Sequence, residues 1–189
     1  MRKQLALVGV FLVSLSGCAP GPDSAKLPGP AEPPPSAGTV VRTDPAGDAL
    51  IAPDAKIQKL AGGFTFTEGP IWIKDGGHLL FSDIPANVIR KWTPDGQVTV
   101  FMENSGYDAG KPPREGFIGS NGLTLDSQGR LIIMQMGNGQ VARREPDGKI
   151  TVLADKYQGK RLNSPNDAVY KSDGSLYFTD PPYGFVKQD

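Results

Sequence analysis

Three oxygen-bearing side chains stand at the same place in three similar stretches of the sequence. Glu68 opens Glu-Gly-Pro-Ile-Trp, Asn121 opens Asn-Gly-Leu-Thr-Leu, and Asn166 opens Asn-Asp-Ala-Val-Tyr. A carboxylate and amide oxygens that meet at one point suit Ca²⁺, which takes about 6–8 oxygen ligands. No His or Cys lies near them in the sequence, which argues against zinc or copper. The residue types predict a site for calcium or another divalent cation, provided that the fold brings the three positions together.

Each of these residues opens a short apolar segment that leads, through a polar turn containing Gly, to a second segment rich in aromatic and β-branched residues. The three stretches are 68–83, 121–135 and 166–180. This alternation is typical of β-hairpins. Gly76, Gly129 and Gly174 fall in the turns, where hairpins require a positive φ. We therefore expect a hairpin in each stretch.

A second repeated unit follows the first two hairpins. Residues 89–101 and 141–153 are similar, and both carry Pro-Asp-Gly between two apolar segments. The three stretches start at residues 68, 121 and 166, close to the period of four-stranded propeller blades. The pattern predicts an all-β fold, a β-propeller of which about two and a half blades are present. A β-sandwich with coincidentally similar hairpins is the alternative, which two matched half-repeats at matched spacing disfavour.

A propeller also predicts the site. Its innermost strands surround the central axis, so equivalent positions of successive blades converge at one mouth of the channel. A propeller closes with about 4–8 blades. We therefore expect this sequence to be an incomplete copy of the ring and to be inactive alone.

At this point the residues carry a family resemblance, which runs from about residue 56 to the end of the chain. The sequence resembles the regucalcin/gluconolactonase family in Glu68-Gly-Pro with Trp72, Phe81-Ser-Asp83, Asn121-Gly-Leu123, Arg161-Leu-Asn-Ser-Pro-Asn-Asp167 and Tyr177-Phe-Thr-Asp-Pro-Pro-Tyr-Gly184. The resemblance implies a six-bladed propeller with one Ca²⁺ or similar ion at the channel mouth. It also implies hydrolysis of sugar lactones to open-chain acids.

The resemblance assigns roles to a few residues of this sequence. Glu68 matches the first metal ligand, and Asn166 matches a residue that contacts metal or substrate. Asn121 is a candidate for substrate binding because it holds the equivalent repeat position, and Arg161 because it precedes the third inner strand. The family's remaining Asn ligand and its Asp general base belong to later blades and have no counterpart here. Asp167 is the one weak catalytic candidate, and it could equally cap a turn or orient Asn166.

The first 18 residues predict a lipoprotein signal peptide. A basic start and an apolar run lead to Leu15-Ser-Gly-Cys18, which resembles the lipobox in which Cys18 is lipidated. An ordinary secretory signal is the alternative. Ala19 after the cysteine favours the outer membrane, facing the periplasm, with membrane contact only through the lipid. Residues 19–48, rich in Pro, predict a disordered tether, and residues 49–189 the folded part.

Composition excludes some functions and leaves others open. Lys plus Arg and Asp plus Glu number 20 each, and no basic patch of the kind that nucleic-acid binding requires is present. A small-molecule sugar lactone is the expected partner. Two other functions remain open: a non-enzymatic envelope propeller that binds a ligand or protein, and a hydrolase of other esters.

Overall fold

The structure is a computed structural model that describes residues 37–111 and 116–184. These residues belong to the second of the two units into which the chain divides, Ser36–Asp189. Cys18, the signal peptide at 1–18 and most of the tether at 19–48 lie outside the described residues. The lipid anchor therefore stays a prediction, which membrane fractionation of a Cys18→Ser variant would test.

The described chain begins with little regular structure. A short 3₁₀ helix, η1 (Pro45–Ala49), is capped by Asp44, whose side chain accepts a hydrogen bond from the backbone N–H of Ala46 at 2.8 Å. The predicted boundary at residue 48 falls inside this helix. Within the described ranges, no helix has the length and apolar character needed to cross a membrane.

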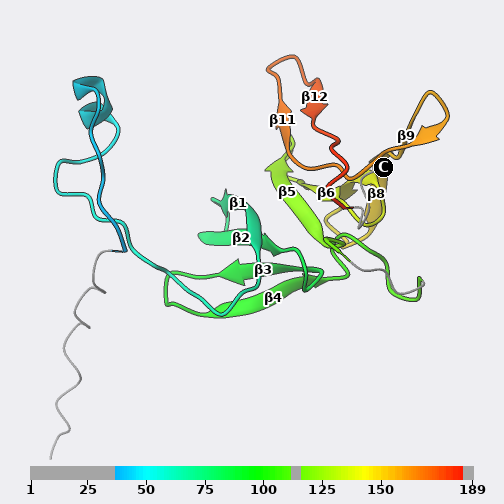
Figure 1. The fold of residues 1–189 in the computed structure, drawn as a ribbon, viewed down its shortest axis with the longest axis horizontal. Coiled ribbons are helices and arrows are strands. Elements are labelled where there is room, and N and C mark those ends of the chain that lie inside the picture. Colours follow the sequence, from blue (N-terminus) through cyan, green and yellow to red (C-terminus); the bar gives the residue numbers. More distant parts are fainter. Residues whose placement is uncertain (1–36, 112–115, 185–189) are drawn as a thin grey trace, which may run out of the picture. The chain divides into compact units, whose positions relative to one another are not determined.

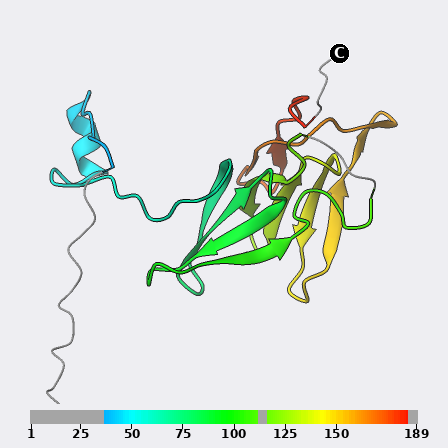
Figure 2. The same cartoon turned by 60° about the horizontal axis from the view of Figure 1, so that its bottom comes forward.

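All other regular structure is β-strand, arranged in antiparallel sheets (Figures 1 and 2). The first sheet holds β1 (Thr67–Ile73), β2 (His78–Asp83), β3 (Val88–Trp92) and β4 (Val98–Glu103) in that order. The second holds β5 (Ser120–Leu125), β6 (Leu131–Gln135), β7 (Gln140–Arg144) and β8 (Ile150–Ala154). Then come two hairpins, β9 (Lys156–Tyr157) with β10 (Lys160–Arg161) and β11 (Ala168–Tyr170) with β12 (Leu176–Phe178). The two predicted four-stranded repeats and the half repeat are confirmed.

The same hydrogen-bonded turn closes four of the hairpins. In the turn after β5, Asp126 N–H donates to the carbonyl of Arg130 at 3.0 Å and Gly129 N–H to the carbonyl of Asp126 at 2.9 Å. Equivalent bonds close the turns that begin at Thr93, Glu145 and Lys171. The glycines of these turns have φ between +75° and +87°. That conformation is open to glycine at little cost, which explains the predicted Gly at each turn.

Apolar side chains on the two faces of β6 hold neighbouring sheets together. Leu131 and Ile133 pack with Leu80, Ile89 and Leu123 between the first and second sheets. Ile132 and Met134, which alternate with them, pack with Val141 against Ala168, Tyr170, Leu176 and Phe178 of the third unit. Successive strand residues point to opposite sides of a sheet, so β6 can pack apolar side chains against a different neighbour on each face. The innermost strands β1, β5 and β11 come into contact as a result.

A buried cluster of serines joins the first two sheets beside this apolar core. Ser82, Ser105 and Ser120 are fully buried. The Ser82 and Ser120 hydroxyls lie 2.8 Å apart, and Ser120 Oγ bonds Ser105 Oγ at 2.9 Å. Ser82 Oγ also donates to the backbone carbonyl of Asn121 at 2.7 Å. The first sheet thereby fixes the start of β5, where a predicted site residue lies.

The start of β1 is fixed from the other side by the segment that precedes it. Asp83 is buried and paired with Arg90, whose Nε and Nη2 both lie 2.9 Å from its Oδ2. Its Oδ1 accepts a hydrogen bond from the backbone N–H of Thr65 at 3.3 Å. The Arg90 guanidinium lies over the ring of Phe64, 5.2 Å from its centroid. These contacts hold residues 64–66 against β2 just before Glu68.

Candidate functional site

The structure brings Glu68, Asn121 and Asn166 into the lining of one pocket of about 250 Å³. They come from three successive blades: Glu68 from β1, Asn121 from β5, and Asn166 from the residues just before β11. Five apolar or aromatic residues complete the lining: Phe66, Ile84, Phe117, Met136 and Tyr183. Few polar groups within mostly apolar walls are typical of a small-molecule site.

Two glycines allow the inner strands to approach closely enough for this convergence. Gly69 follows Glu68 and has φ +58°; a Cβ there would overlap the carbonyl oxygen of Asn121. Gly122 follows Asn121 and donates its N–H to the Asn166 carbonyl at 2.7 Å; a Cβ there would lie 2.6 Å from that oxygen. Both glycines sit at irregularities of the strand pairing, between Glu68 and Ile71 and between Ser120 and Leu123. The Glu-Gly and Asn-Gly pairs are therefore packing requirements of the site.

The oxygens that face the pocket are free to bind something else. Among the described residues, no hydrogen bond or ion pair engages the side chain of Glu68 or of Asn166. Asn121 is only 6% exposed, and its Nδ2 donates to the sulfur of Met136 at 3.4 Å. That bond assigns the amide nitrogen to Met136 and leaves Oδ1 as the atom for a ligand. Asn121 is buried, Asn166 half-buried and Glu68 exposed, so the three side chains combine access to solvent with oxygens that a ligand could engage.

The donor set fits a calcium ion in part. One carboxylate and two amide oxygens are hard ligands of the kind that Ca²⁺ takes, with room for further ligands or water. Within residues 37–111 and 116–184 no three His, Cys, Asp or Glu side chains gather closely enough to hold a metal. A site here would therefore depend on the amides beside the single carboxylate, Glu68.

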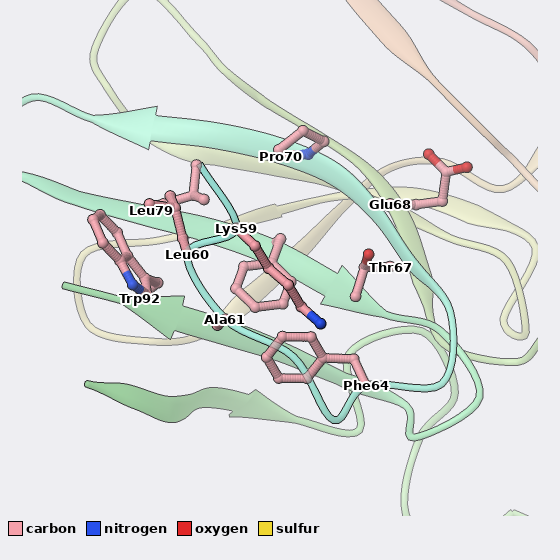
Figure 3. A pocket seen from close by; sticks show the side chains of 10 residues that line it. Lys59, Leu60, Ala61, Phe64, Thr67, Glu68, Pro70, Leu79 and Trp92 are labelled. Atoms are coloured by element: carbon pink, nitrogen blue, oxygen red, sulfur yellow. The ribbon is translucent and has the colours of Figure 1, made fainter. Parts of the chain in front are cut away.

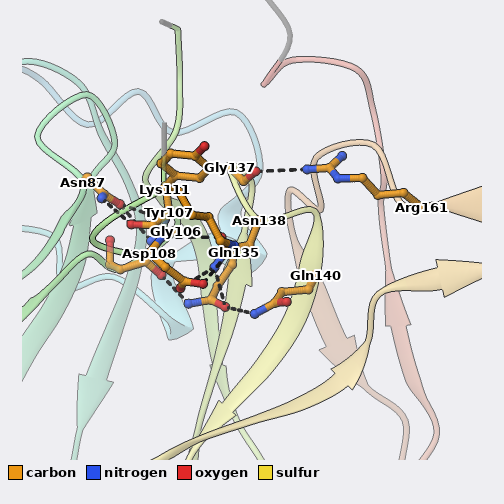
Figure 4. Close-up of polar contacts among 11 residues, drawn as sticks. Asn87, Gly106, Tyr107, Asp108, Lys111, Gln135, Gly137, Asn138, Gln140 and Arg161 are labelled. Atoms are coloured by element: carbon orange, nitrogen blue, oxygen red, sulfur yellow. Dashed lines mark hydrogen bonds and ion pairs between the residues drawn. The ribbon is translucent and has the colours of Figure 1, made fainter. Parts of the chain in front are cut away.

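Arg161 is not brought into the pocket. Its guanidinium donates to the backbone carbonyls of Leu162 at 2.6 Å and Asn163 at 2.8 Å. It also donates to the carbonyl of Gly137 at 3.0 Å (Figure 4). It packs so closely over Gly139 that a Cβ there would overlap it. The side chain fastens β10 to the turn between β6 and β7. A substrate contact by Arg161 stays a prediction, and the geometry gives it a structural task.

Asp167, the weak candidate for a general base, does not line the pocket either. Its Oδ1 accepts the N–H of Ala168 at 2.8 Å, and it lines a separate hollow formed by β11 and β12. A Cβ on Gly122 would lie 2.7 Å from that Oδ1, so the carboxylate packs beside β5, and its role as a base stays a prediction.

Five lining residues were not among the predicted site residues: Phe66, Ile84, Phe117, Met136 and Tyr183. Met136 directly follows β6, as Ile84 follows β2, and both line the pocket. The position after the second strand of each repeat could therefore indicate a pocket residue from the sequence. Phe117 lies in the long connection between the first two sheets. That connection has no counterpart in the repeat, so the sequence does not indicate that Phe117 lines the pocket.

A larger pocket of about 370 Å³ lies against the first sheet, lined mostly by apolar residues from Lys59 to Trp92 (Figure 3). Glu68 stands at the end of this pocket away from Trp92 (Figure 3). The asparagines are absent from its lining, so the smaller pocket is the one where the chemistry-bearing residues meet.

Comparison with known proteins shows the family to which the chain is similar. Residues 66–189 match the sequence profile of the SMP-30/Gluconolactonase/LRE-like region. A gluconolactonase from Zymomonas mobilis is 39% identical over 156 residues, which are 80% of this chain and 43% of that protein. The chain thus spans less than half the length of that relative.

Two solved structures are similar as well. A gluconolactonase from Xanthomonas campestris superposes with a TM-score of 0.64 at 34% identity, covering 75% of this chain and 44% of that one. A structural-genomics protein described as a candidate gluconolactonase gives 0.61 at 38% identity, covering 72% and 44%. The predicted all-β propeller fold, present as its first blades, is confirmed.

Proposed function

The chain belongs to the SMP-30/Gluconolactonase/LRE-like family, and from this premise we propose that the protein hydrolyses sugar lactones with Ca²⁺ bound beside Glu68. Water adds to the lactone carbonyl carbon, the ring C–O bond breaks, and the products are a carboxylic acid and a free hydroxyl on one open chain. Two similar proteins, from Zymomonas mobilis and Xanthomonas campestris, are gluconolactonases.

One observation carries the proposal: three successive blades each present one oxygen-bearing side chain to the same pocket, with no partner for those oxygens among the described residues. Glu68 is exposed and Asn166 half-buried, so it is the convergence of one carboxylate and two amides from three blades on one pocket that supports a ligand site.

The residues divide the work according to their chemistry. Glu68 and Asn166 would hold the ion, with Asn121 Oδ1 directed at the same space to bind the ion or a substrate hydroxyl. A bound divalent ion polarises the carbonyl and stabilises the developing negative charge, an effect of several kcal/mol. Glu68 is the only carboxylate among the described residues that line the pocket, and we assign it as a ligand of the ion. The base that accepts the proton of the attacking water is therefore placed outside these eight residues.

The test compares Glu68→Gln with Glu103→Gln in the full-length protein. Glu103 is an exposed glutamate at the end of β4 and does not line the pocket, so it controls for loss of a carboxylate on the same sheet. We expect Glu68→Gln to lower kcat/KM for D-glucono-1,5-lactone by about 100-fold or more, because a metal ligand is lost. Glu103→Gln should behave as wild type, and a calcium chelator should reproduce the Glu68→Gln loss.

Two results would redirect the proposal. If Glu68→Gln and chelation both left the rate unchanged, the pocket would not be the catalytic site. If the wild type bound Ca²⁺ but hydrolysed no lactone, other esters and then non-enzymatic ligand binding would be the functions to test.

A further inference from the structure

Three exposed aromatic side chains stand around the pocket beside the polar residues. Phe66, Phe117 and Tyr183, here called the aromatic rim, are 47%, 41% and 56% exposed, and all three line the pocket. Single exposed apolar residues are ordinary on a protein surface. Three aromatic rings gathered at one pocket are a different case, since grouped exposed apolar surface marks ligand-binding sites.

The backbone beneath the rim is held in place by hydrogen bonds. Ile84 is 1% exposed; its N–H donates to the Phe66 carbonyl at 3.0 Å, and its own carbonyl accepts the N–H of Gly119 at 3.1 Å. Ile84 therefore ties the segment of Phe66 to the segment of Phe117. The two rings lie with centroids 5.4 Å apart, tilted by 39°.

The connection that carries Phe117 is anchored at its start as well. Asn87 accepts the N–H groups of Gly106 and Tyr107 at 2.9 and 3.1 Å (Figure 4). Gln135 donates to the Ser105 carbonyl at 2.8 Å. Lys111 and Asp108 both bond Asn138, which follows β6 (Figure 4). Side chains of both sheets thus hold residues 105–111 of this connection.

Tyr183 lies in a third segment whose backbone is held by hydrogen bonds. Ser164, fully buried, accepts the N–H of Gly184 at 2.8 Å and donates to the Pro181 carbonyl at 2.6 Å. A Cβ on Gly184 would lie 3.4 Å from the carbonyl oxygen of Phe117, so this segment lies against that of Phe117. The three rings are exposed, but the backbone that carries them is positioned before any ligand arrives.

We propose that the aromatic rim is the subsite for the ring of a carbohydrate lactone, receiving its C–H face while the hydroxyls and the carbonyl meet Glu68, Asn121 and Asn166. This rests on the proposed function and names the feature of the substrate that the site selects. A pyranose-type ring is apolar on its faces and polar at its edge. The lining offers both kinds of group, three aromatic rings and the oxygen-bearing side chains of Glu68, Asn121 and Asn166.

The rim makes a specific kinetic prediction. Phe117→Ala and Tyr183→Leu should raise KM for D-glucono-1,5-lactone by about 5-fold or more and change kcat less than about 2-fold, because the ring contact is made equally in ground and transition states. Ca²⁺ affinity should not change, because no rim residue carries the carboxylate or amide oxygen that the ion prefers. Phe117→Tyr keeps the ring and should keep KM near wild type. Tyr177→Leu is the control, since Tyr177 is 59% exposed but does not line the pocket.

A binding experiment without turnover gives the second readout. Saturation-transfer NMR on the full-length protein would use 1,5-anhydro-D-glucitol, which has the ring and hydroxyls but no carbonyl. We expect saturation of its ring C–H protons, lost in Phe117→Ala and in Tyr183→Leu and kept in Tyr177→Leu. Tyr183→Leu serves if Phe117→Ala fails to fold, because Tyr183 is the most exposed of the three.

The outcomes separate this inference from the proposed function. If the wild type hydrolyses lactones while the rim variants keep their KM and their saturation pattern, the rim is not a subsite and the hydrolase proposal stands. If no lactone is hydrolysed but the sugar ring binds and the rim variants lose it, the subsite stands and the hydrolase proposal falls.

Discussion

Polar side chains at the two ends of the blades differ in whether they accept hydrogen bonds within the fold. At the hairpin end, Asp95, Asp147 and Asp173 each accept the backbone N–H two residues ahead, at 3.4, 3.0 and 2.9 Å. At the mouth, Glu68 and Asn166 accept no hydrogen bond on their side chains from any described residue. Both ends lie near solvent, so exposure alone does not explain the difference.

The contrast shows which polar groups serve the fold and which serve a ligand. Hydrogen bonds to Thr93, Lys149 and Lys171, respectively, are the largest influences that lower the pKa values of Asp95, Asp147 and Asp173. These carboxylates therefore stay ionised and keep the turns closed. The side-chain oxygens of Glu68 and Asn166 close no turn and accept no hydrogen bond from a described residue. The blades are stabilised at one end and left chemically open at the other.

The sharpest way to break this contrast is to add one methyl group at the mouth. Gly69→Ala would place a Cβ against the Asn121 carbonyl and 2.9 Å from Leu123 N, at φ +58°. We expect a loss of about 2–4 kcal/mol in the free energy of unfolding, measured with urea, because two inner strands must move apart. Gly129→Ala has a similar φ of +75° but open space around it, and should cost about 1 kcal/mol. Equal losses in the two variants would contradict the close-approach role of Gly69.

Replacing Asp126 should destabilise the turn between β5 and β6 at the hairpin end of the second sheet. Its Oδ1 accepts the N–H groups of Gln128 and Arg130, both at 2.9 Å, and its Oδ2 bonds Arg130 Nε at 2.7 Å. Asp126→Asn should cost about 1–2 kcal/mol at pH 7, because charge-assisted bonds are lost. Asp75→Asn, in an exposed hairpin of the first sheet, is the matched control and should cost nothing measurable.

The same variant tests the pH dependence. Burial acts to raise the pKa of Asp126, but the backbone N–H and guanidinium of Arg130 outweigh it, so the pKa lies below its ordinary 3.8. Ionised Asp126 therefore stabilises the fold above that ordinary value, and the stabilisation disappears as pH falls through the lowered one. Urea unfolding of wild type and Asp126→Asn should converge as pH is lowered below about 4. A constant difference down to pH 2 would refute this role for Asp126.

The smallest expected effect comes from Met136, whose sulfur accepts a hydrogen bond from Asn121 at the pocket. Met136→Leu removes the sulfur that holds Asn121 Nδ2 and keeps the apolar volume. We expect Ca²⁺ affinity, measured by calorimetry on the full-length protein, to fall about 3–10-fold, because one neutral hydrogen bond that orients Asn121 is lost. Met134→Leu, equally buried but facing the third unit, should leave the affinity unchanged. Identical affinities in both variants would show that Met136 does not orient Asn121.

Much of the fold could be read from the sequence because propeller blades are local structures. Each turn is set by a Gly with positive φ, and each strand pair by residues close in the chain. The repeat also predicted that Glu68, Asn121 and Asn166 share a position. Their convergence followed from the repeat, since equivalent positions meet at the axis.

The neighbours of these residues could not be read in the same way. Arg161 has the charge of a substrate clamp, but its guanidinium is taken by backbone carbonyls that include Gly137, 24 residues away. Asp167 has the chemistry of a base, but its Oδ1 accepts the N–H of Ala168 and the residue lines a different hollow. The aromatic rim joins residues 66, 117 and 183, which share no repeat position.

By itself, then, the sequence determined the blades and the three oxygen-bearing positions, because both depend on short-range turn chemistry repeated along the chain. The tertiary structure alone decided which oxygens stay free, which side chain orients Asn121, and which aromatic rings surround the pocket. Those features depend on contacts between blades, where residues far apart in sequence compete for the same hydrogen bonds and the same space.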